Sequence, residues 1–133
     1  MYAEALGELR AGAKRSHWMW FVFPQLAGLG SSPTARHFAI RDLAEARAYL
    51  KHGELGRRLR EATTATAVWA GRQTLPGIFG PVDALKFVSC MTLFEAAADA
   101  DGPADFANAL DALAAGVRDR HTLRLIAADR PPA

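Results

Sequence analysis

The sequence predicts an all-α protein, and three features indicate this class. Apolar residues recur every three to four positions over several stretches. Runs of alternating polar and apolar residues, which are typical of strands, are nearly absent. Short clusters rich in glycine, proline and serine separate the periodic stretches. The most apolar stretch, at about 81–99, is predicted to be a central helix that packs against the aromatic segment 17–25.

Length and composition predict an ordinary globular protein. The 133 residues fit a single domain over 1–133, with 50% apolar and 23% charged residues. The net charge of +2, without a long run of like charges, does not favour nucleic-acid binding. One cysteine, Cys90, excludes an internal disulfide. With no visible signal peptide and no apolar run long enough for a bilayer, we expect a soluble cytoplasmic protein without membrane partners.

The aromatic segment 17–25 is compatible with a helix or a strand. In a strand, Trp18 and Trp20 would share one face. We predict a short buried helix instead, because Ser16 is a suitable N-cap and Pro24 would end the helix. The large aromatic side chains favour burial of this segment in the core.

The other helices are predicted from periodicity and from residues typical of helix ends. The expected helices are 2–13, one starting at Pro33 after the cap Ser32, one capped by Asp42 that continues over 46–51 to a stop at Gly53, 54–70, 81–99, 104–115 and 119–128. The segments 26–33 and 71–80 are predicted to be irregular, the second with a turn at Pro76-Gly77.

The helix 81–99 is apolar over most of its circumference. Val82 and Leu85 follow one side, and Phe87 and Met91 follow another. A helix of this kind is central to its domain and has little solvent-facing surface on which to place charges. The polar residues on it are therefore candidates for a functional site.

A resemblance to a known family rests on several of these stretches. The stretch Lys-Arg-Ser-His-Trp-Met-Trp-Phe-Val-Phe-Pro-Gln-Leu-Ala-Gly-Leu-Gly-Ser-Ser-Pro, at 14–33, resembles the signature of the domain of unknown function family 1810. The match continues through 45–50, 55–59, 79–80, 83–86, 91–94 and 119–123. The resemblance implies a bacterial, single-domain, helical protein, and it implies no activity.

Two departures from the family pattern accompany the match. Members usually have an additional N-terminal segment, which would end where this chain begins. Either the start of this sequence is placed too late or the chain is short of one wall of the fold. In the second case, a second copy in a homodimer is one way to fill the gap. Cys90 also stands where relatives tend to have a serine.

The four residues Lys14 to His17, at the start of the aromatic segment, suggest acid-base chemistry or anion binding. His17 is a candidate general acid or base, because imidazole titrates near neutral pH. Its alternative role is structural, with a ring nitrogen bonded to a backbone carbonyl. Lys14, Arg15 and Ser16 are candidates for holding a phosphate or carboxylate. Alternatively, the two cations only complement the dipole at the end of the first helix.

The aromatic segment also offers candidates for binding a flat ring. Trp18 and Trp20 are candidates for stacking on a ligand ring, although tryptophans in so apolar a run are more often core residues. Only one of the two needs to be exposed. Gln25 is a candidate for orienting the ligand through its amide.

Four further candidates lie on the central helix. Asp83 and Lys86 are three residues apart, so their side chains can meet, and we predict an acid-base role for both. A plain ion pair at the start of a helix is the alternative. Ser89 and Thr92 add hydroxyl groups within two turns, and we predict that they contact the ligand.

Neither a metal site nor a cofactor motif is predicted. The histidines lack metal-binding spacing, and one cysteine cannot build a structural zinc site. Two function classes remain. The first is a small enzyme or binding protein for an anionic, ring-bearing, nucleotide-like metabolite. The alternative is a non-catalytic helical interaction module on whose outer helices a partner protein docks.

Overall fold

The all-α prediction is confirmed. The structure, a computed structural model, describes residues 1–30 and 32–128, and the only extended pairing there is an isolated bridge between Leu26 and Ile40. The helices of the described residues are α1 (Tyr2–Arg10), α2 (Met19–Val22), α3 (Pro33–Phe38), α4 (Leu43–Lys51), α5 (Gly53–Ala67), α6 (Leu75–Phe79), α7 (Pro81–Ala97), α8 (Asp105–Leu113) and α9 (Arg120–Ala128). None of them is long and apolar enough to cross a membrane.

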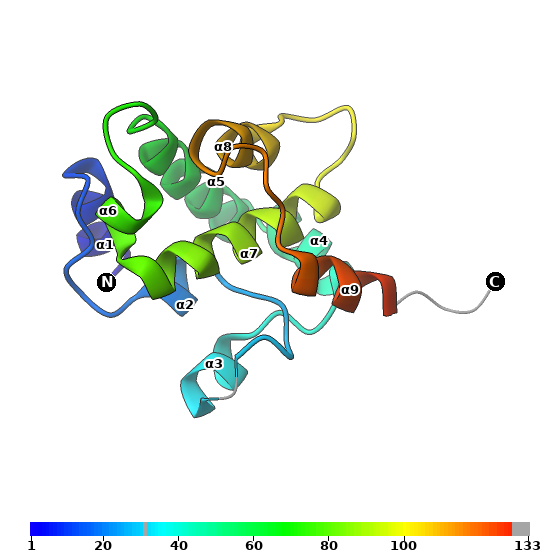
Figure 1. Cartoon of the computed structure of the whole chain (residues 1–133). Coiled ribbons are helices and arrows are strands. Elements are labelled where there is room, and N and C mark those ends of the chain that lie inside the picture. The colour runs from blue at the N-terminus through cyan, green and yellow to red at the C-terminus, as the bar shows by residue number, and fades with distance from the viewer. Residues whose placement is uncertain (31, 129–133) are drawn as a thin grey trace.

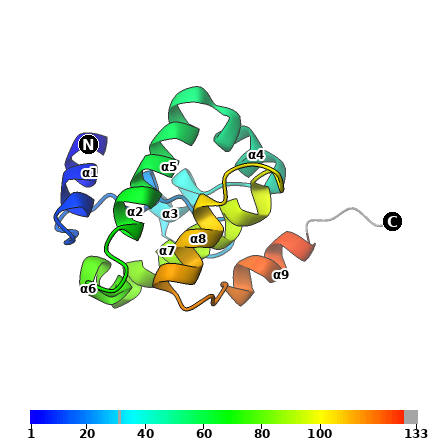
Figure 2. The ribbon, with the colours of Figure 1, turned by 90° about the horizontal axis from the view of Figure 1, so that it is seen from above.

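Helix α7 runs through the middle of the molecule (Figure 1) and contacts α4, α6, α8 and α9. Helix α5 packs against α1, α4 and α8 on one side of it. Helix α3 lies on the other side, away from α5 and α8. Seen from above, α1 and α9 occupy opposite edges of the molecule (Figure 2). The short α3 is therefore the outlying element of the fold.

The core confirms that the central helix and the aromatic segment pack together. Phe87 of α7 is fully buried, and its ring centroid lies 5.1 Å from that of Phe23, edge to face. Phe79 stacks on Phe87 at 5.3 Å and meets Phe23 edge-on at 6.0 Å, so the three rings form one cluster. Further along α7, Phe94 packs against Phe106 of α8. Aromatic pairs of this geometry add to the free energy gained from burial.

Local capping signals place α3 and α4 as predicted. The Ser32 hydroxyl accepts a hydrogen bond from the Ala35 amide at 3.1 Å, and Pro33 is the first residue of α3. The Asp42 carboxylate accepts one from the Glu45 amide at 2.8 Å at the start of α4. Each cap satisfies a backbone donor that the helix leaves free.

Two predicted boundaries are wrong. The segment 71–80 was expected to be irregular, but it contains α6, because the Thr74 hydroxyl accepts from the Gly77 amide at 3.0 Å and caps a helix there. Gly53 was expected to stop a helix, but it begins α5. His52 caps α5 instead, through Nδ1, which accepts from the Leu55 amide at 3.1 Å.

The expectation that the central helix has little solvent-facing surface is wrong at Val82 and Leu85. Their exposed fractions are 65% and 71%. The opposite face of this turn, which carries Ala84 and Phe87, enters the core. Val82 and Leu85 instead lie at the edge of a cavity.

Candidate functional site

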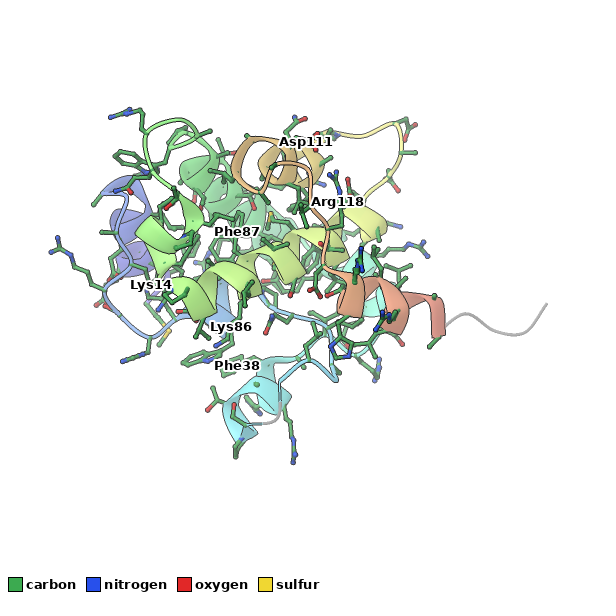
Figure 3. All side chains as sticks on the ribbon, viewed as in Figure 1. Lys14, Phe38, Lys86, Phe87, Asp111 and Arg118 are labelled. Atoms are coloured by element: carbon green, nitrogen blue, oxygen red, sulfur yellow. The ribbon has the colours of Figure 1, made fainter. Side chains whose placement is uncertain are left out.

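A cavity of about 410 Å³ lies between the segment carrying α2 and α3 and the N-terminal half of α7, with the start of α9 at its edge. This volume is within the range of small-molecule pockets. Figure 3 shows Phe38 of α3 close to Lys86 of α7. The large aromatic side chains that line the cavity are Trp20 and Phe38, and the polar ones are Gln25, Ser32, Lys86, Ser89, Asp119 and His121.

The aromatic side of the cavity is formed by α2 and α3. Met19 and Val22 are the buried residues of α2, and Trp20 between them remains partly exposed. The Trp20 ring stacks on Phe38, with a centroid separation of 5.8 Å and an angle of 17° between the planes. Phe21 meets the same Phe38 ring edge-on at 6.4 Å. Trp20 and Phe38 form the aromatic wall of the cavity, with Phe21 packed on Phe38 outside the lining, and Phe38 keeps 37% of its surface exposed.

A short pairing at its base holds the segment that carries α3. The Ile40 amide donates to the Gln25 carbonyl at 2.8 Å, and the Ala27 amide donates to the Ile40 carbonyl at 2.7 Å. The two ends of the segment between Gln25 and Ile40 are thereby held together near the buried Leu26. This pairing holds Gln25 and Phe38 in the wall of the same cavity.

The polar side of the cavity joins α7 to the start of α9. The Ser89 hydroxyl donates to the Leu85 carbonyl at 3.1 Å. Asp119 Oδ2 accepts from the Thr122 amide at 2.9 Å and from the Thr122 hydroxyl at 2.6 Å, and so caps α9. The Asp119 amide donates to the Thr92 hydroxyl oxygen at 3.0 Å. This hydrogen bond from its backbone amide to Thr92 of α7 helps to hold Asp119 in place.

One carboxylate on α7 joins two lysines. Asp83 Oδ2 lies 3.0 Å from Lys14 Nζ, and Asp83 Oδ1 lies 3.3 Å from Lys86 Nζ. Lys14 Nζ also donates to the Ser16 carbonyl at 2.6 Å and lies 5.2 Å from the centroid of the Trp18 ring. The Lys14 side chain is 8% exposed and that of Lys86 is 33% exposed. Of the two lysines, only Lys86 is a residue of the cavity wall.

Arg118 fixes the position of Asp119. Its guanidinium donates to both carboxylate oxygens of Glu95 on α7, at 3.0 and 2.6 Å. Its Nη1 also donates to Asp111 at 2.9 Å and to the Gly116 carbonyl at 2.8 Å (Figure 3). The hydrogen bonds to Glu95 and then Asp111 raise the pKa of Arg118. A bidentate arginine–carboxylate contact restricts the relative orientation of its two partners, and here it holds the α8–α9 connection against α7.

Arg118→Met is expected to lower the free energy of unfolding by about 1–2 kcal/mol, because it removes a bidentate pair that is only partly exposed. Urea denaturation measures this change. Arg120→Met, at an exposed neighbouring position, is the matched control and should change stability by less than about 0.5 kcal/mol. Equal effects of the two substitutions would contradict the role of Arg118.

Four of the predicted site residues line the cavity. They are Trp20, Gln25, Lys86 and Ser89. Thr92 is buried behind the cavity, where it supports Asp119. The wall of the cavity therefore combines candidates from the aromatic segment with candidates from the central helix.

The predicted residues from 15 to 18 do not line the cavity. Ser16 was considered as a helix cap, but its hydroxyl donates to Glu8 Oε2 at 2.7 Å and α2 begins later. The Trp18 indole donates to Glu8 Oε1 at 3.0 Å, and the Arg15 amide bonds to the same oxygen. His17 is exposed, apart from the cavity lining. The acid-base role of His17 and the ligand contacts of Arg15, Ser16 and Trp18 remain predictions.

Sequence reasoning missed Asp119, His121 and Phe38. Only the family-like stretch 119–123 drew attention to the first two. Their position beside α7 depends on Arg118 and on the path of the α8–α9 connection. Phe38 gave no signal of its own, because a lone phenylalanine on a short polar helix resembles an ordinary surface residue.

The described residues offer neither a metal-binding cluster nor an accessible cysteine nucleophile. Over residues 1–30 and 32–128, no group of three His, Cys, Asp or Glu side chains could hold a metal ion. Cys90 is fully buried in α7, and this burial raises the pKa of its thiol. A protonated, inaccessible thiol is a poor nucleophile.

These observations define an all-α protein with a partly polar cavity between its central helix and an outlying short helix. The model of the family "protein of unknown function (DUF1810)" matches residues 1–126, and the chain belongs to that family. The chain is similar to the conserved hypothetical protein Rv1873 from Mycobacterium tuberculosis, whose crystal structure gives a TM-score of 0.89 at 52% identity. The match covers 95% of this chain and 88% of that one. No curated protein matches the chain.

Proposed function

We propose that the cavity binds a small anionic molecule that carries a flat ring, of the size and polarity of a nucleoside monophosphate. One observation supports this proposal above the others. Two stacked aromatic residues and a lysine line the same ligand-sized space of about 410 Å³. Aromatic surface with a few convergent polar groups is the usual composition of a small-molecule site.

The ring of the ligand would lie against the aromatic wall of Trp20 and Phe38. Their partly exposed rings offer an apolar face beside the cavity. Stacking on such a face is favourable for any flat ring and carries little base specificity. Gln25 is then the group that could read the edge of the ring, because its amide both donates and accepts hydrogen bonds.

The anionic group would bind Lys86, and a hydroxyl group would bind Asp119. Lys86 is the lysine of the cavity lining, and Asp119 Oδ1 makes no hydrogen bond to the described residues. A free carboxylate oxygen accepts from a hydroxyl or an amine. A sugar phosphate satisfies both groups. We assign no reaction, because His17 is not among the lining residues and Asp83 is occupied by two lysines.

Thermal unfolding with adenosine 5′-monophosphate (AMP), adenosine and ribose 5-phosphate as probes tests this proposal. A probe present at a hundred times its Kd stabilises the folded protein by about 2.7 kcal/mol, and we expect AMP to give the largest increase in Tm. Lys86→Met should reduce the increase with AMP and leave the effect of adenosine unchanged. Trp20→Leu should reduce both.

The chain provides a matched control for the lysine variant. Its lysines are Lys14, Lys51 and Lys86, and Lys51 is exposed on α4, outside the cavity lining. Lys51→Met removes the same charge, so the increase in Tm with AMP should persist. An equal loss in both variants would indicate non-specific electrostatic binding and would contradict the proposed site.

One observation favours the alternative of an interaction module. Val82 and Leu85 are largely exposed beside the cavity, and exposed apolar clusters often mark protein contacts. If no anionic ring compound raises the Tm, and Leu85→Glu also abolishes concentration-dependent association in sedimentation, the interaction module is the better assignment.

A further inference from the structure

The charged cluster behind the cavity contains more positive than negative charge. Asp83 uses one carboxylate oxygen for Lys14 and the other for Lys86, at 3.0 and 3.3 Å. Two ammonium groups therefore share one carboxylate. Figure 3 shows Lys14 and Lys86 on either side of the start of α7. We call Lys14, Asp83 and Lys86 the charge array, which has a net charge of +1.

The two lysines differ in how much they need the carboxylate. The Lys14 side chain is only 8% exposed, and an ammonium group so far from water needs a counterion. Its other partners, the Ser16 carbonyl and the face of the Trp18 ring, carry no full charge. The Lys86 side chain is 33% exposed and can be solvated. Asp83 is therefore mainly the counterion of Lys14.

This asymmetry leaves Lys86 available to another anion. An exposed lysine paired with its own carboxylate would be neutralised and would attract a ligand only weakly. Here the buried Lys14 offsets the charge of Asp83, while Asp83 still holds the Lys86 ammonium near one position. The Lys86 ammonium group is therefore held in one position by Asp83, while its charge is only partly neutralised.

We propose that the charge array makes the cavity selective for a ligand with one anionic group, and that Lys14 and Asp83 are positioning residues that determine this selectivity. The proposal rests on the proposed function, because it concerns the same cavity. A single carboxylate balances the excess charge of the array, and a single phosphate monoester, with a charge of about −1.5 to −2 near pH 7, more than balances it. Additional phosphates would find no second lysine and no arginine among the described lining residues and would approach Asp119 instead. The ligand class is thus a ring compound with one anionic group and a hydroxyl or amine donor, not a polyphosphate.

The net charge of the array can be changed in steps. Lys14→Met and Lys86→Met each reduce the charge of the array to zero, and the double variant Lys14→Met/Asp83→Asn restores +1 on Lys86. Methionine matches the length of the lysine chain and fits a buried position, so folding should be retained. Isothermal titration with AMP and adenosine measures the contribution of charge as the ratio of their affinities.

We expect Lys14→Met to weaken AMP binding about tenfold, nearly as much as Lys86→Met, although Lys14 is not in the cavity wall. The double variant should recover the affinity for AMP to within about threefold of the wild type. Adenosine binding should stay constant throughout, and a merely structural role of Lys14 would not produce this pattern. An unchanged affinity for AMP in Lys14→Met, or no recovery in the folded double variant, would overturn the proposal.

Two further measurements separate this proposal from the proposed function. Wild-type protein should bind ATP no more tightly than AMP, and binding about tenfold tighter would exclude selectivity for one anionic group. With only three lysines, ¹³C-methylation gives few signals in NMR spectra. Inorganic phosphate should shift the Lys86 signal in the wild type and the double variant but not in Lys14→Met. If phosphate gives this pattern of Lys86 shifts but AMP does not bind, the charge array is retained and the ring site is refuted. If AMP binds but phosphate does not give this pattern, the charge array is refuted.

Discussion

Replacing Gly56 with alanine is expected to lower the free energy of unfolding by about 2–4 kcal/mol, although alanine is the better helix former. Gly56 lies in the first turn of α5, where the backbone of α4 crosses close to it. A Cβ at this position would overlap the carbonyl oxygen of Leu50 and lie 2.9 Å from its carbonyl carbon. Backbone atoms cannot rotate away as a side chain can. The α4–α5 corner would therefore have to open, and Leu59 and Ala62 of the core would move with it.

Gly7→Ala is the matched control for Gly56→Ala. Gly7 also lies inside a helix, α1, and a Cβ there would meet no atom within 4 Å. Helix propensity then acts alone, so this substitution should stabilise the protein by about 0.5–1 kcal/mol. Urea denaturation of both variants at one pH measures the two changes. Changes of the same sign would show that the contact with Leu50 does not control the α4–α5 corner.

The helices that sequence reasoning placed well have local end signals. Ser32 with Pro33, and Asp42 with Glu45, define the starts of α3 and α4 through contacts within four residues. Helix α6 was missed because Thr-Leu-Pro-Gly is compatible with a capped helix start as well as with a turn. Only the burial of its apolar residues in the assembled core decides between the two.

The cavity could be predicted only in part, because two of its walls depend on long-range contacts. Lys86 and Ser89 share a face of α7 through their spacing, and this spacing can be inferred from the sequence. Asp119 reaches the same cavity through the contact of Arg118 with Glu95, 23 residues away. The face of a helix that borders a cavity also looks buried in a periodicity analysis, and this explains the wrong prediction for Val82 and Leu85.

Glu8→Ala is expected to lower the free energy of unfolding by about 2–3 kcal/mol, as estimated for the loss of several hydrogen bonds to one charged acceptor. The Glu8 carboxylate accepts four hydrogen bonds: from the amides of Arg15 and Ser16, the Ser16 hydroxyl and the Trp18 indole. Glu8 thereby fixes the turn that carries Lys14 toward Asp83. Sequence reasoning could not identify Glu8, because it resembles any other acid on the amphipathic α1.

The pH dependence of the unfolding free energy measures the contribution of the Glu8 carboxylate separately from other effects. The hydrogen bond from the Ser16 hydroxyl, followed by those from the Arg15 amide, the Trp18 indole and the Ser16 amide, lowers the pKa of Glu8 from 4.5 to about 2, against the opposing effect of burial. A carboxyl group with a depressed pKa in the folded state stabilises the protein fully above its unfolded value, and this stabilisation is lost as the pH falls toward the folded value. The difference in unfolding free energy between wild type and Glu8→Gln should therefore be constant above about pH 4.5 and shrink toward about pH 2.

Glu4→Gln is the control for both measurements, because Glu4 is an exposed acid in the first turn of the same helix. Its effect should stay below about 0.5 kcal/mol, which is typical of an exposed charge near a helix start. If Glu8→Ala were as stable as the wild type, water would have to replace all four contacts. Lys14 would then be held without Glu8, by Asp83, the Ser16 carbonyl, the Trp18 ring and the hydrogen bond from its own amide to the Ile78 carbonyl.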